Sequence, residues 1–336
     1  MRIFVTGAAG FIGSHFVREL LAGAYPAYAG AQVTVFDKLT YAGNLANLAP
    51  VAGDPRYTFV RGDICDAAAL DAALPGHDLV VNFAAESHVD RSITGAADFV
   101  LTNVLGAQTV FDACLRAGTA RVVHIGTDEV YGSIDAGSWT EDAPLLPNSP
   151  YSAAKAGAEL LARAYAVTYG MNISTTRCSN NYGPYQFPEK VLPLFVTNLM
   201  DGLTVPLYGD GLNVRDWLHV DDHCRGIALV AEKGEAGLSY NIGGGLELPN
   251  RELVEQILAA CGTTWDSVRY VEDRKGHDRR YSVDDSRLRA LGYAPQHSFA
   301  DGLAETVAWY HANEAWWRPL KAAPAPSSPA QPLPVA

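Results

Sequence analysis

The most constraining feature of the sequence is a glycine-rich turn directly behind its first apolar run. The run Arg2–Thr6 is short and apolar, as expected of a buried strand, and the helix candidate Phe11–Ala22 follows it closely. Gly7, Gly10 and Gly13 occupy the junction. Glycines there permit a tight turn and close approach of the backbone, and the start of the helix can accept a pyrophosphate. Three glycines also occur in many ordinary loops, but their position between strand and helix predicts a dinucleotide site.

Short β-rich runs alternate with helical stretches through the first half of the chain. The predicted strands are Arg2–Thr6, Gln32–Phe36, Tyr57–Arg61, Leu79–Phe83, Arg121–Ile125 and Ile173–Thr176. The predicted helices are Phe11–Ala22, Ala67–Leu74, Ala97–Ala117 and Ser152–Thr168. Several of the strands are apolar almost throughout, which is typical of a parallel sheet covered on both faces. The alternation predicts an α/β fold with a Rossmann-type, doubly wound parallel sheet.

The pattern changes after about residue 180, where the sequence becomes rich in Asn, Gly, Pro and Tyr. We expect residues 1–180 to form the dinucleotide-binding domain and to carry the catalytic residues. Residues 181–320 contain shorter elements and polar loops, which predict a smaller, mixed α/β domain that mainly binds substrate. Residues 322–336 are rich in Ala, Pro and Ser and are expected to be disordered.

Charge and cysteine content exclude several classes of protein. The 336 residues carry a formal net charge of −12, which disfavours nonspecific binding to nucleic acids and anionic membranes. No segment approaches the roughly 18–20 apolar residues of a membrane span. The five cysteines are far apart and show neither zinc-ligand nor redox spacing. We therefore expect reduced thiols, no metal, no nucleic-acid or membrane partner, and a cytoplasmic protein.

A carboxylate at the end of the second predicted strand favours NAD as the cofactor. Asp37 could accept hydrogen bonds from the adenosine ribose hydroxyls and would repel a 2′-phosphate, although an ordinary turn aspartate is the alternative. Lys38 beside it leaves NADP open. Asp63 and Ile64, after the third predicted strand, could meet the adenine ring. The expected cofactor contacts are Gly7, Gly10, Phe11, Ile12, Gly13, Asp37, Lys38, Thr40, Asp63, Ile64, Ala84, Thr102, Tyr151, Lys155 and Asn181.

Tyr151 and Lys155 are separated by one helical turn and therefore lie on the same face of a predicted helix. The charge of the lysine is expected to lower the pKa of the tyrosine, which makes a phenolate available near neutral pH. On its own, such a pair is usually a solvated one. Together with the glycine-rich turn and with Thr127, after the fifth predicted strand, it resembles the extended, sugar-nucleotide-modifying branch of the short-chain dehydrogenase/reductase superfamily.

Two adjacent carboxylates follow Thr127 at the end of a strand that is predicted to be buried. Asp128 and Glu129 would face the cofactor edge of the sheet, where an ionised pair costs stability unless the protein uses it. A strand-end turn that leaves both side chains solvated is the alternative.

Four segments carry a closer resemblance: TDEVYG at 127–132, Ala84–Ser92, Arg177–Lys190 and Asp273–Asp284. They resemble the dTDP-glucose 4,6-dehydratase family, and the similarity runs from residue 1 to about residue 320. The resemblance implies an NAD-dependent lyase that acts on dTDP-glucose. It would oxidise carbon 4, eliminate water across carbons 5 and 6 and return the hydride to carbon 6. Tightly bound NAD+ would thereby be regenerated in every turnover and the product would be dTDP-4-keto-6-deoxyglucose.

The resemblance also assigns roles to individual residues. Tyr151 would remove the hydroxyl proton at carbon 4, assisted by Thr127 and Lys155. Glu129 would remove the carbon 5 proton, while a protonated Asp128 would donate to the carbon 6 hydroxyl as water leaves. The assignment of base and acid comes from the resemblance and not from the residues themselves.

Cations for the substrate's diphosphate are plentiful in the second half of the chain. The resemblance places Arg215, Asn250 and His277 at the nucleotide and Asn180 and Glu189 near the sugar. For a single arginine the alternative is an ordinary surface charge, and for Tyr208 it is a core position. The expected substrate contacts are Ser87, Thr127, Asn180, Glu189, Lys190, Pro206, Tyr208, Arg215, Asn250, Arg274, His277 and Tyr281.

Other readings remain open from the sequence. A UDP-sugar 4-epimerase needs no acid–base pair beyond the tyrosine, and GDP-mannose dehydratases and UDP-glucuronate decarboxylases typically lack the aspartate before the glutamate. A non-catalytic NAD-binding sensor would commonly have lost the tyrosine, the lysine or the carboxylates. The resemblance favours a homodimer, in which the helices at Ala97–Ala117 and Ser152–Thr168 could pair across a two-fold axis.

Overall fold

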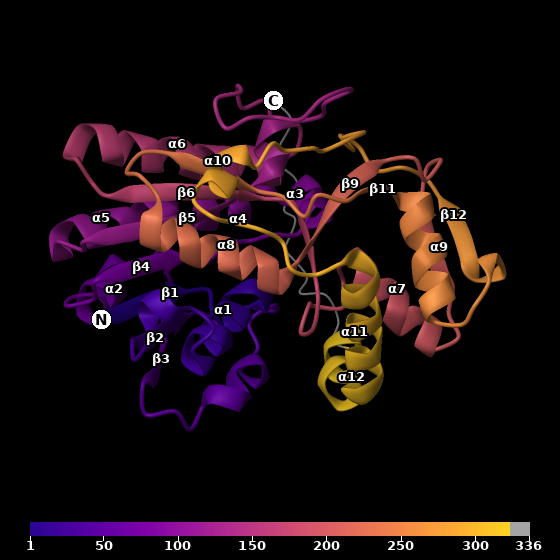
Figure 1. The fold of residues 1–336 in the computed structure, drawn as a ribbon, viewed down its shortest axis with the longest axis horizontal. Coiled ribbons are helices and arrows are strands. Elements are labelled where there is room, and N and C mark those ends of the chain that lie inside the picture. Colours follow the sequence, from indigo (N-terminus) through magenta and orange to yellow (C-terminus); the bar gives the residue numbers. More distant parts are fainter. Residues whose placement is uncertain (323–336) are drawn as a thin grey trace, which may run out of the picture.

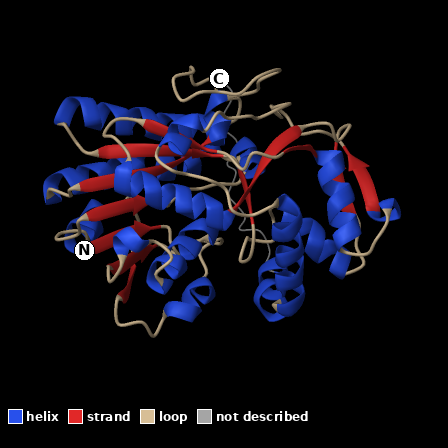
Figure 2. Ribbon diagram, in the orientation of Figure 1, coloured by secondary structure: helices blue, strands red, loops and turns tan. Residues whose placement is uncertain are grey.

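A seven-stranded, entirely parallel sheet forms the larger layer of the computed structural model, which describes residues 1–322 (Figures 1 and 2). The strand order is β3-β2-β1-β4-β5-β6-β10. The strands are β1 (Arg2–Thr6), β2 (Gln32–Asp37), β3 (Tyr57–Arg61), β4 (Leu79–Asn82), β5 (Arg121–Thr127), β6 (Ile173–Cys178) and β10 (Ser239–Ile242). This order reverses between β1 and β4, so the predicted doubly wound Rossmann-type fold is confirmed.

Helices cover both faces of this sheet because its strands are apolar on both sides. Ile3 and Val5 point to one face and Phe4 to the other, and all three are fully buried. The face of Ile3 packs against α1 (Phe11–Ala22) and α8 (Val220–Lys233). The opposite face packs against α2 (Ala67–Ala73), α5 (Ala107–Ala117) and α6 (Pro150–Tyr169).

The predicted helix over Ala97–Ala117 is not a continuous α-helix. The structure has α3 (Val89–Thr94), α4 (Ala96–Phe99), a stretch of π-helix, η3 (Val100–Gly106), and then α5. Within η3, the Asn103 side chain accepts from the Glu86 amide at 2.8 Å and donates to the Glu86 carbonyl at 2.9 Å. The π-helical turn therefore fixes the loop that follows β4 to this helix. Such turns are frequent at functional sites.

A smaller lobe lies beside the sheet, at the right of Figures 1 and 2. Its strands are β7 (Asn180–Tyr182), β9 (Val214–His219) and β11 (Glu247–Pro249) in one sheet, and β8 (Val205–Tyr208) and β12 (Val268–Val271) in another. Its helices are α7 (Val191–Met200), α9 (Asn250–Ala260), α11 (Phe299–Ala312) and α12 (Glu314–Ala322). Short turns complete the chain: η1 (Pro26–Tyr28), η2 (Leu45–Val51), η4 (Asp128–Tyr131), η5 (Trp265–Ser267) and α10 (Ser286–Ala290).

The chain crosses between the two lobes more than once. Strand β10 is part of the seven-stranded sheet and helix α8 packs against it, although both come after residue 180. The lobe boundary therefore follows contacts rather than chain order. Of the expected disordered tail, residues 322–336, Ala322 is the last residue of α12, and residues 323–336 lie outside the described part of the chain. Within that described part, no helix is long and apolar enough to cross a membrane.

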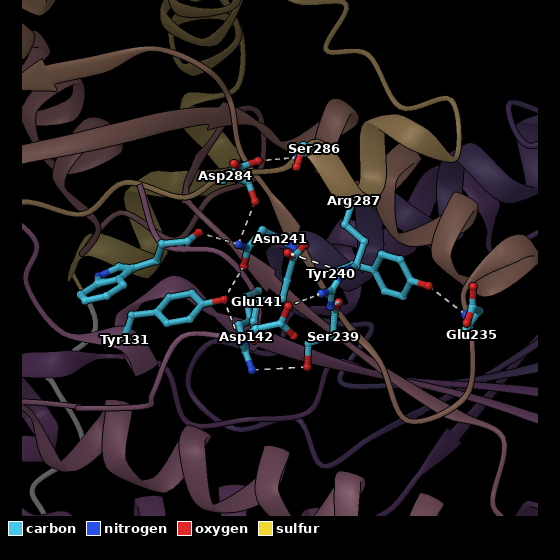
Figure 3. Close-up of polar contacts among 12 residues, drawn as sticks. Tyr131, Glu141, Asp142, Glu235, Ser239, Tyr240, Asn241, Asp284, Ser286 and Arg287 are labelled. Carbon is cyan, nitrogen blue, oxygen red and sulfur yellow. Dashed lines mark hydrogen bonds and ion pairs between the residues drawn. The ribbon is translucent and has the colours of Figure 1, made fainter. Parts of the chain in front are cut away.

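A buried polar network fastens β10 to the turn η4 (Figure 3). The Asn241 side chain accepts from the Tyr131 hydroxyl at 2.8 Å and donates to the carbonyls of Trp139 and Asp284, each at 2.9 Å. Its own amide donates to the Glu141 carboxylate at 2.9 Å. Because Tyr131 ends the turn that begins with Asp128, the network fixes the segment on which the adjacent carboxylates stand.

Candidate active site

A cavity of about 340 Å³ follows the carboxyl ends of the sheet strands, where open α/β sheets bind ligands. The walls come from the ends of β1, β2, β5 and β6 and from the loops after β3 and β4. Every residue expected to contact the cofactor lines this cavity. Five of the expected substrate residues line it as well: Ser87, Thr127, Asn180, Glu189 and Lys190.

The glycine-rich turn fits the pyrophosphate of a dinucleotide. A Cβ on Gly7 would meet the amide nitrogen of Ala84 at 2.5 Å, and one on Gly13 would meet the Cα of Ala8 at 2.8 Å. Gly7 also has φ +68°, a left-handed conformation that glycine adopts without strain. Gly10 caps α1 without a side-chain hydrogen bond, so the first amides of the helix are free to bind an anion.

Asp37 stands where an adenosine ribose would be read. It is buried and accepts from the amides of Ala9 at 2.9 Å and Leu39 at 2.7 Å. Lys38 forms an ion pair with Asp63 at 2.6 Å, so its charge is already neutralised within the protein. This pairing weakens the reason for leaving NADP open, because a 2′-phosphate would meet Asp37 without a free lysine beside it.

Helix α6 delivers Tyr151 and Lys155 to the cavity. Its start is fixed by a capping box, in which the Ser149 side chain accepts from the Ser152 amide and the Ser152 side chain accepts from the Ser149 amide. Pro150 occupies the first helical position, which suits its fixed φ. Both functional side chains are consequently placed within the first two turns of a rigid helix, and Lys155 donates to the Ile125 carbonyl.

The pKa of Tyr151 is raised in this structure, and not lowered as its spacing from Lys155 had predicted. Burial, together with the carboxylate of Glu129, raises the pKa of Tyr151 well above its ordinary value, and the hydroxyl of Thr127 opposes that rise. Burial also lowers the pKa of Lys155 to about 8. Burial disfavours the charged form of both groups, the phenolate of Tyr151 and the ammonium of Lys155.

Thr127, Asp128 and Glu129 turn sharply away from the end of β5. Thr127 caps η4, and its hydroxyl accepts from the Glu129 amide at 3.3 Å. Asp128 is buried, with an exposed fraction of 3%, while Glu129 is partly buried. The alternative of a solvated strand-end pair is therefore excluded.

The two carboxyl groups have different electrostatic surroundings. Burial and the neighbouring carboxylates of Glu129 and Asp216 raise the pKa of Asp128 well above its ordinary value. One oxygen of Asp128, Oδ2, has no hydrogen-bond partner among residues 1–322. Burial also raises the pKa of Glu129, but the charges of Arg274, Arg215 and Lys190 oppose that rise.

Glu189 and Lys190, which are expected near the sugar, are held in place by residues from other loops of the site. The Glu189 carboxylate accepts from the Tyr41 hydroxyl at 3.0 Å and from the Arg91 guanidinium at 2.8 Å. Lys190 caps α7 and donates to the Ser87 carbonyl at 2.7 Å. These contacts fix the side chains of Glu189 and Lys190 just before the first residue of α7.

The remaining expected substrate residues do not line the cavity. Arg215 is buried, donates to the Asp278 carbonyl at 2.9 Å and stacks at 4.2 Å on the ring of Tyr281. His277 binds Asp273 at 2.6 Å and meets the ring of Tyr208 edge-on. These groups form a second cluster, and the charges of Arg215 and Arg274 reach Glu129 in the cavity. Pro206 lies in β8 and Asn250 opens α9.

Several cavity residues were not predicted from the sequence: Gly43, Asn44, Asn47, Ala85, Glu86, Tyr185, Gln186, Phe187, Trp316 and Leu320. Tyr185, Gln186 and Phe187 stand within the segment Arg177–Lys190, so that segment was a usable signal. Trp316 and Leu320 lie at the far end of the chain, and nothing in the local pattern marks them. They reach the cavity only through the tertiary fold.

Two side-chain groups beyond the cavity contain enough ligand atoms to hold an ion: His219, His297 and Glu305, and Asp221, Asp222 and His297. The rings of His219 and His297 stack at a centroid distance of 4.1 Å and an interplanar angle of 24°. Ligand lone pairs lie in the plane of each imidazole, so nearly parallel rings do not converge on a shared ion. The stacked arrangement instead suits packing of α8 against the segment before α11.

The fold and the site together define the class of protein. A parallel sheet with a glycine-rich turn, a Tyr151–Lys155 helix and a polar strand end at Thr127 is the arrangement of a short-chain dehydrogenase that acts on nucleotide sugars. A family model described as GDP-mannose 4,6 dehydratase matches residues 4–306.

Individual relatives narrow this class. The chain is 60% identical over 322 residues to dTDP-glucose 4,6-dehydratase of Streptomyces niveus, covering 96% of each protein. It is 61% identical over 329 residues to dTDP-glucose 4,6-dehydratase of Streptomyces griseus, covering 98% of this chain and 99% of the relative. This chain belongs to the dTDP-glucose 4,6-dehydratase family.

Solved structures agree with this assignment. The chain is similar to the crystal structure of dTDP-glucose 4,6-dehydratase from Streptomyces venezuelae with NAD and TYD bound, with a TM-score of 0.94 and 65% identity. That match covers 95% of this chain and all of the other. UDP-glucuronic acid 4-epimerase from Bacillus cereus, in complex with UDP-glucuronic acid and NAD, is 27% identical with a TM-score of 0.87. This match covers 93% of this chain and 99% of the epimerase. The wider fold therefore also includes epimerases.

Proposed function

We propose that this chain dehydrates dTDP-glucose to dTDP-4-keto-6-deoxyglucose with the help of NAD. The observation that carries the proposal is the pair Asp128 and Glu129 in the cavity, where a buried carboxyl group of raised pKa stands beside a second carboxyl group that is flanked by cations. An epimerase needs no such pair, because its chemistry ends with the return of the hydride to carbon 4. Membership of the dehydratase family supports the same conclusion.

The residues around the glycine-rich turn would hold NAD. The amides at the start of α1 would bind the pyrophosphate, Asp37 the adenosine ribose, and Lys155 the nicotinamide ribose. When bound, NAD+ supplies a hydride acceptor for carbon 4 and later the hydride donor for carbon 6. The protein's own task is to orient the cofactor against the sugar and to move protons.

Tyr151, Thr127 and Lys155 would handle the proton at the carbon 4 hydroxyl. Tyr151 removes that proton as carbon 4 is oxidised, and Thr127 holds the same hydroxyl by a hydrogen bond. Because burial raises the pKa of Tyr151, its phenolate is costly in the protein alone. The positive nicotinamide ring and the Lys155 ammonium would both favour the phenolate in the complete site.

Glu129 and Asp128 would carry out the elimination. Once carbon 4 is a ketone, the proton on carbon 5 becomes acidic, and Glu129 removes it. When carbon 6 has later received the hydride, carbon 5 must regain a proton, which the protonated Glu129 would return. The raised pKa of Asp128 favours the protonated form of its carboxyl, and in that form it can donate to the carbon 6 hydroxyl as water leaves. Its partnerless Oδ2 is available for that hydrogen bond.

Substrate binding would involve both clusters of polar residues. Ser87, Asn180, Glu189 and Lys190 would meet the sugar within the cavity. The diphosphate and the nucleotide would lie toward the second cluster, on Arg215, Arg274 and His277, with Tyr281, Asn250, Pro206 and Tyr208 around them. On this proposal residues 1–180 mainly bind NAD and catalyse, and residues 181–320 mainly bind the nucleotide sugar.

We also propose a homodimer that acts in the cytoplasm. Apolar side chains stand exposed along η3 and α6, namely Val100, Leu101, Leu105, Leu160 and Val167. Burying this strip against a second copy would remove apolar surface from water. The cytoplasm is supported by the five cysteines, which are all unpaired.

The test of this function is turnover of the purified protein with dTDP-glucose and, separately, UDP-glucose and GDP-mannose. Mass spectrometry should find loss of one water from dTDP-glucose and unchanged masses for the others. The double variant Asp128→Asn/Glu129→Gln is the control, because it retains the fold and lacks both proton-transfer groups. A product of unchanged mass with an inverted hydroxyl would identify an epimerase, and water loss from GDP-mannose alone would reassign the nucleotide.

A further inference from the structure

The last described helix, α12, reaches the cofactor cavity. Trp316 and Leu320 of this helix line the cavity together with Gly10, Phe11 and Asn47 from the N-terminal part of the chain. Figure 1 shows α11 and α12, in yellow, together between the large sheet and the part of the smaller lobe that holds α9 and β12. The helix therefore lies where the two lobes meet, and it forms part of the wall beside the glycine-rich turn.

A chain of hydrogen bonds joins Trp316 to that turn. The indole Nε1 of Trp316 donates to the Asn47 side-chain oxygen at 2.9 Å, and the Asn47 side-chain nitrogen donates to the Ala9 carbonyl at 2.9 Å. Ala9 lies between Gly7 and Gly10, and Asn47 is almost fully buried. A side-chain amide buried in this way holds its partners in one geometry, because losing either bond would leave a polar group unpaired.

An aromatic and cationic cluster supports the indole from behind. Tyr185 lines the cavity with φ +68°, a strained value for a residue that is not glycine. Its ring packs against Trp309 at a centroid distance of 4.5 Å and edge-on against Trp316 at 5.6 Å. The Arg18 guanidinium covers the same ring at 4.2 Å. Strain of this kind persists where the surroundings hold the residue in place, and here they hold Tyr185 against the cavity wall.

The other side of α12 is anchored in the smaller lobe. Asp201, at the end of α7, accepts from Arg318 at 2.8 Å and from Lys321 at 2.7 Å. Trp317 is fully buried, and its indole donates to the Tyr310 carbonyl at 2.8 Å. Helix α12 is thus bound to the smaller lobe on one side and to the glycine-rich turn on the other.

We propose that α12 is a clasp for the dinucleotide, in which Trp316 closes the cavity and slows the release of NAD. This inference rests on the proposed NAD site and adds a cofactor-binding element that lies far from it in the sequence. A cofactor regenerated in each turnover gains nothing by leaving, so a slow exit costs no rate. The indole of Trp316 forms part of one cavity wall and holds Asn47 against the glycine-rich turn. Removing the indole would therefore open an exit for the dinucleotide and loosen the turn that binds its pyrophosphate.

The experiment measures exchange of bound, labelled NAD against excess unlabelled NAD in the full-length protein. We expect Trp316→Ala to release label at least about tenfold faster than the unchanged protein, since changes at a binding surface act mostly on dissociation. Trp316→Phe, which keeps an aromatic wall and loses the bond to Asn47, should lie between the two. It also serves if Trp316→Ala fails to fold.

Two further variants separate a clasp from general packing. Trp309→Phe alters the same aromatic cluster at a residue that does not itself line the cavity, and it should exchange NAD at the unchanged rate even if it melts at a lower temperature. Asp201→Asn removes the anchor shared by Arg318 and Lys321, and it should speed exchange while kcat at saturating NAD stays the same.

The contrary outcomes are distinct. Unchanged exchange in both Trp316 variants would overturn the clasp, as would equal acceleration by Trp309→Phe, which would reduce Trp316 to a packing residue. If the unchanged protein bound no NAD at all, the proposed function would fail instead.

Discussion

Asp128 and Glu129 are consecutive residues on one turn, yet different charges surround their two carboxyl groups. Asp128 is buried beside the carboxylate of Asp216, whereas Glu129 lies within the influence of Arg274 and Lys190. Burial raises the pKa of both groups, but neighbouring carboxylates add to the rise at Asp128, whereas the charges of Arg274 and Lys190 oppose it at Glu129. A single turn after β5 therefore supplies an acid and a base at one place, which an elimination requires.

Replacing each of the two carboxyl groups should impair a different step of the reaction. We expect Asp128→Asn and Glu129→Gln each to lower kcat by roughly 10²–10⁴-fold, the usual contribution of a positioned acid or base. In deuterated water, Glu129→Gln should also lose incorporation of deuterium at carbon 5, because no base removes that proton. Magnetic resonance of the recovered sugar nucleotide measures both effects. Full activity in either variant would refute the roles assigned here.

Lys155 should lower the stability of the protein at neutral pH. Its pKa in the folded state is about 8, below its ordinary value of 10.5, so folding disfavours its charged form. The cost is complete below about pH 8 and disappears as the pH rises toward 10.5. Lys155→Met should therefore have a free energy of unfolding at pH 7 that is higher by roughly 2–4 kcal/mol, as the pKa difference implies. Denaturant titration measures this difference.

The sign of this effect is the informative part. The advantage of Lys155→Met over the unchanged protein should shrink between pH 8 and pH 10.5, while its activity is lost at every pH. An advantage that stays constant or grows across this range would show that burial does not lower the pKa of Lys155.

Asn241 should be important for stability although it is remote from the chemistry. Asn241→Ala removes the acceptor of the Tyr131 hydroxyl and a donor to two partly buried carbonyls, those of Trp139 and Asp284 (Figure 3). A buried group left unpaired costs about 1–3 kcal/mol, so we expect a loss of about 2–4 kcal/mol in the free energy of unfolding. Asn198→Ala, which loses one bond at the surface, is the matched control and should cost less than about 1 kcal/mol. Denaturant titration checks both; equal losses would contradict the structural role of the network.

The exposed strip on η3 and α6 gives a prediction about assembly. Leu101→Glu combined with Leu160→Glu should convert a dimer into monomers, because each charge would be buried at the contact without a partner. Leu203→Glu places the same change at an exposed leucine of the smaller lobe and should leave the dimer intact. Sedimentation of the three proteins measures the mass. Monomers in the unchanged protein would rule the proposed contact out.

The sheet and its ligand edge were predictable because their signals are local. Apolar runs placed six of the seven sheet strands, and the glycine-rich turn with Asp37 placed the cofactor end of the cavity. Strand β10 was missed because Ser239–Ile242 alternates polar and apolar residues over only four positions. Its place in the sheet is decided by pairing with β6, which is a long-range contact.

Burial explains the other differences from the sequence-based expectations. The spacing of Tyr151 and Lys155 predicted their proximity to the cavity but not their desolvation, which reverses the expected direction of the tyrosine pKa. In the same way, Trp316 follows an ordinary amphipathic stretch, and only the fold brings it to Asn47. Properties that depend on which surfaces meet could not be deduced from spacing.

The most direct test of the account uses dTDP-glucose labelled with deuterium at carbon 4. The proposed reaction takes the hydride from carbon 4 and returns it to carbon 6 within one active site, so the 4-keto-6-deoxy product should carry the label at carbon 6. Magnetic resonance of the product locates it. Label at carbon 6 would establish oxidation, elimination and return of the hydride by one bound cofactor. A dehydrated product without the label at carbon 6, or recovery of the label at carbon 4 of an epimer, would contradict the central claim.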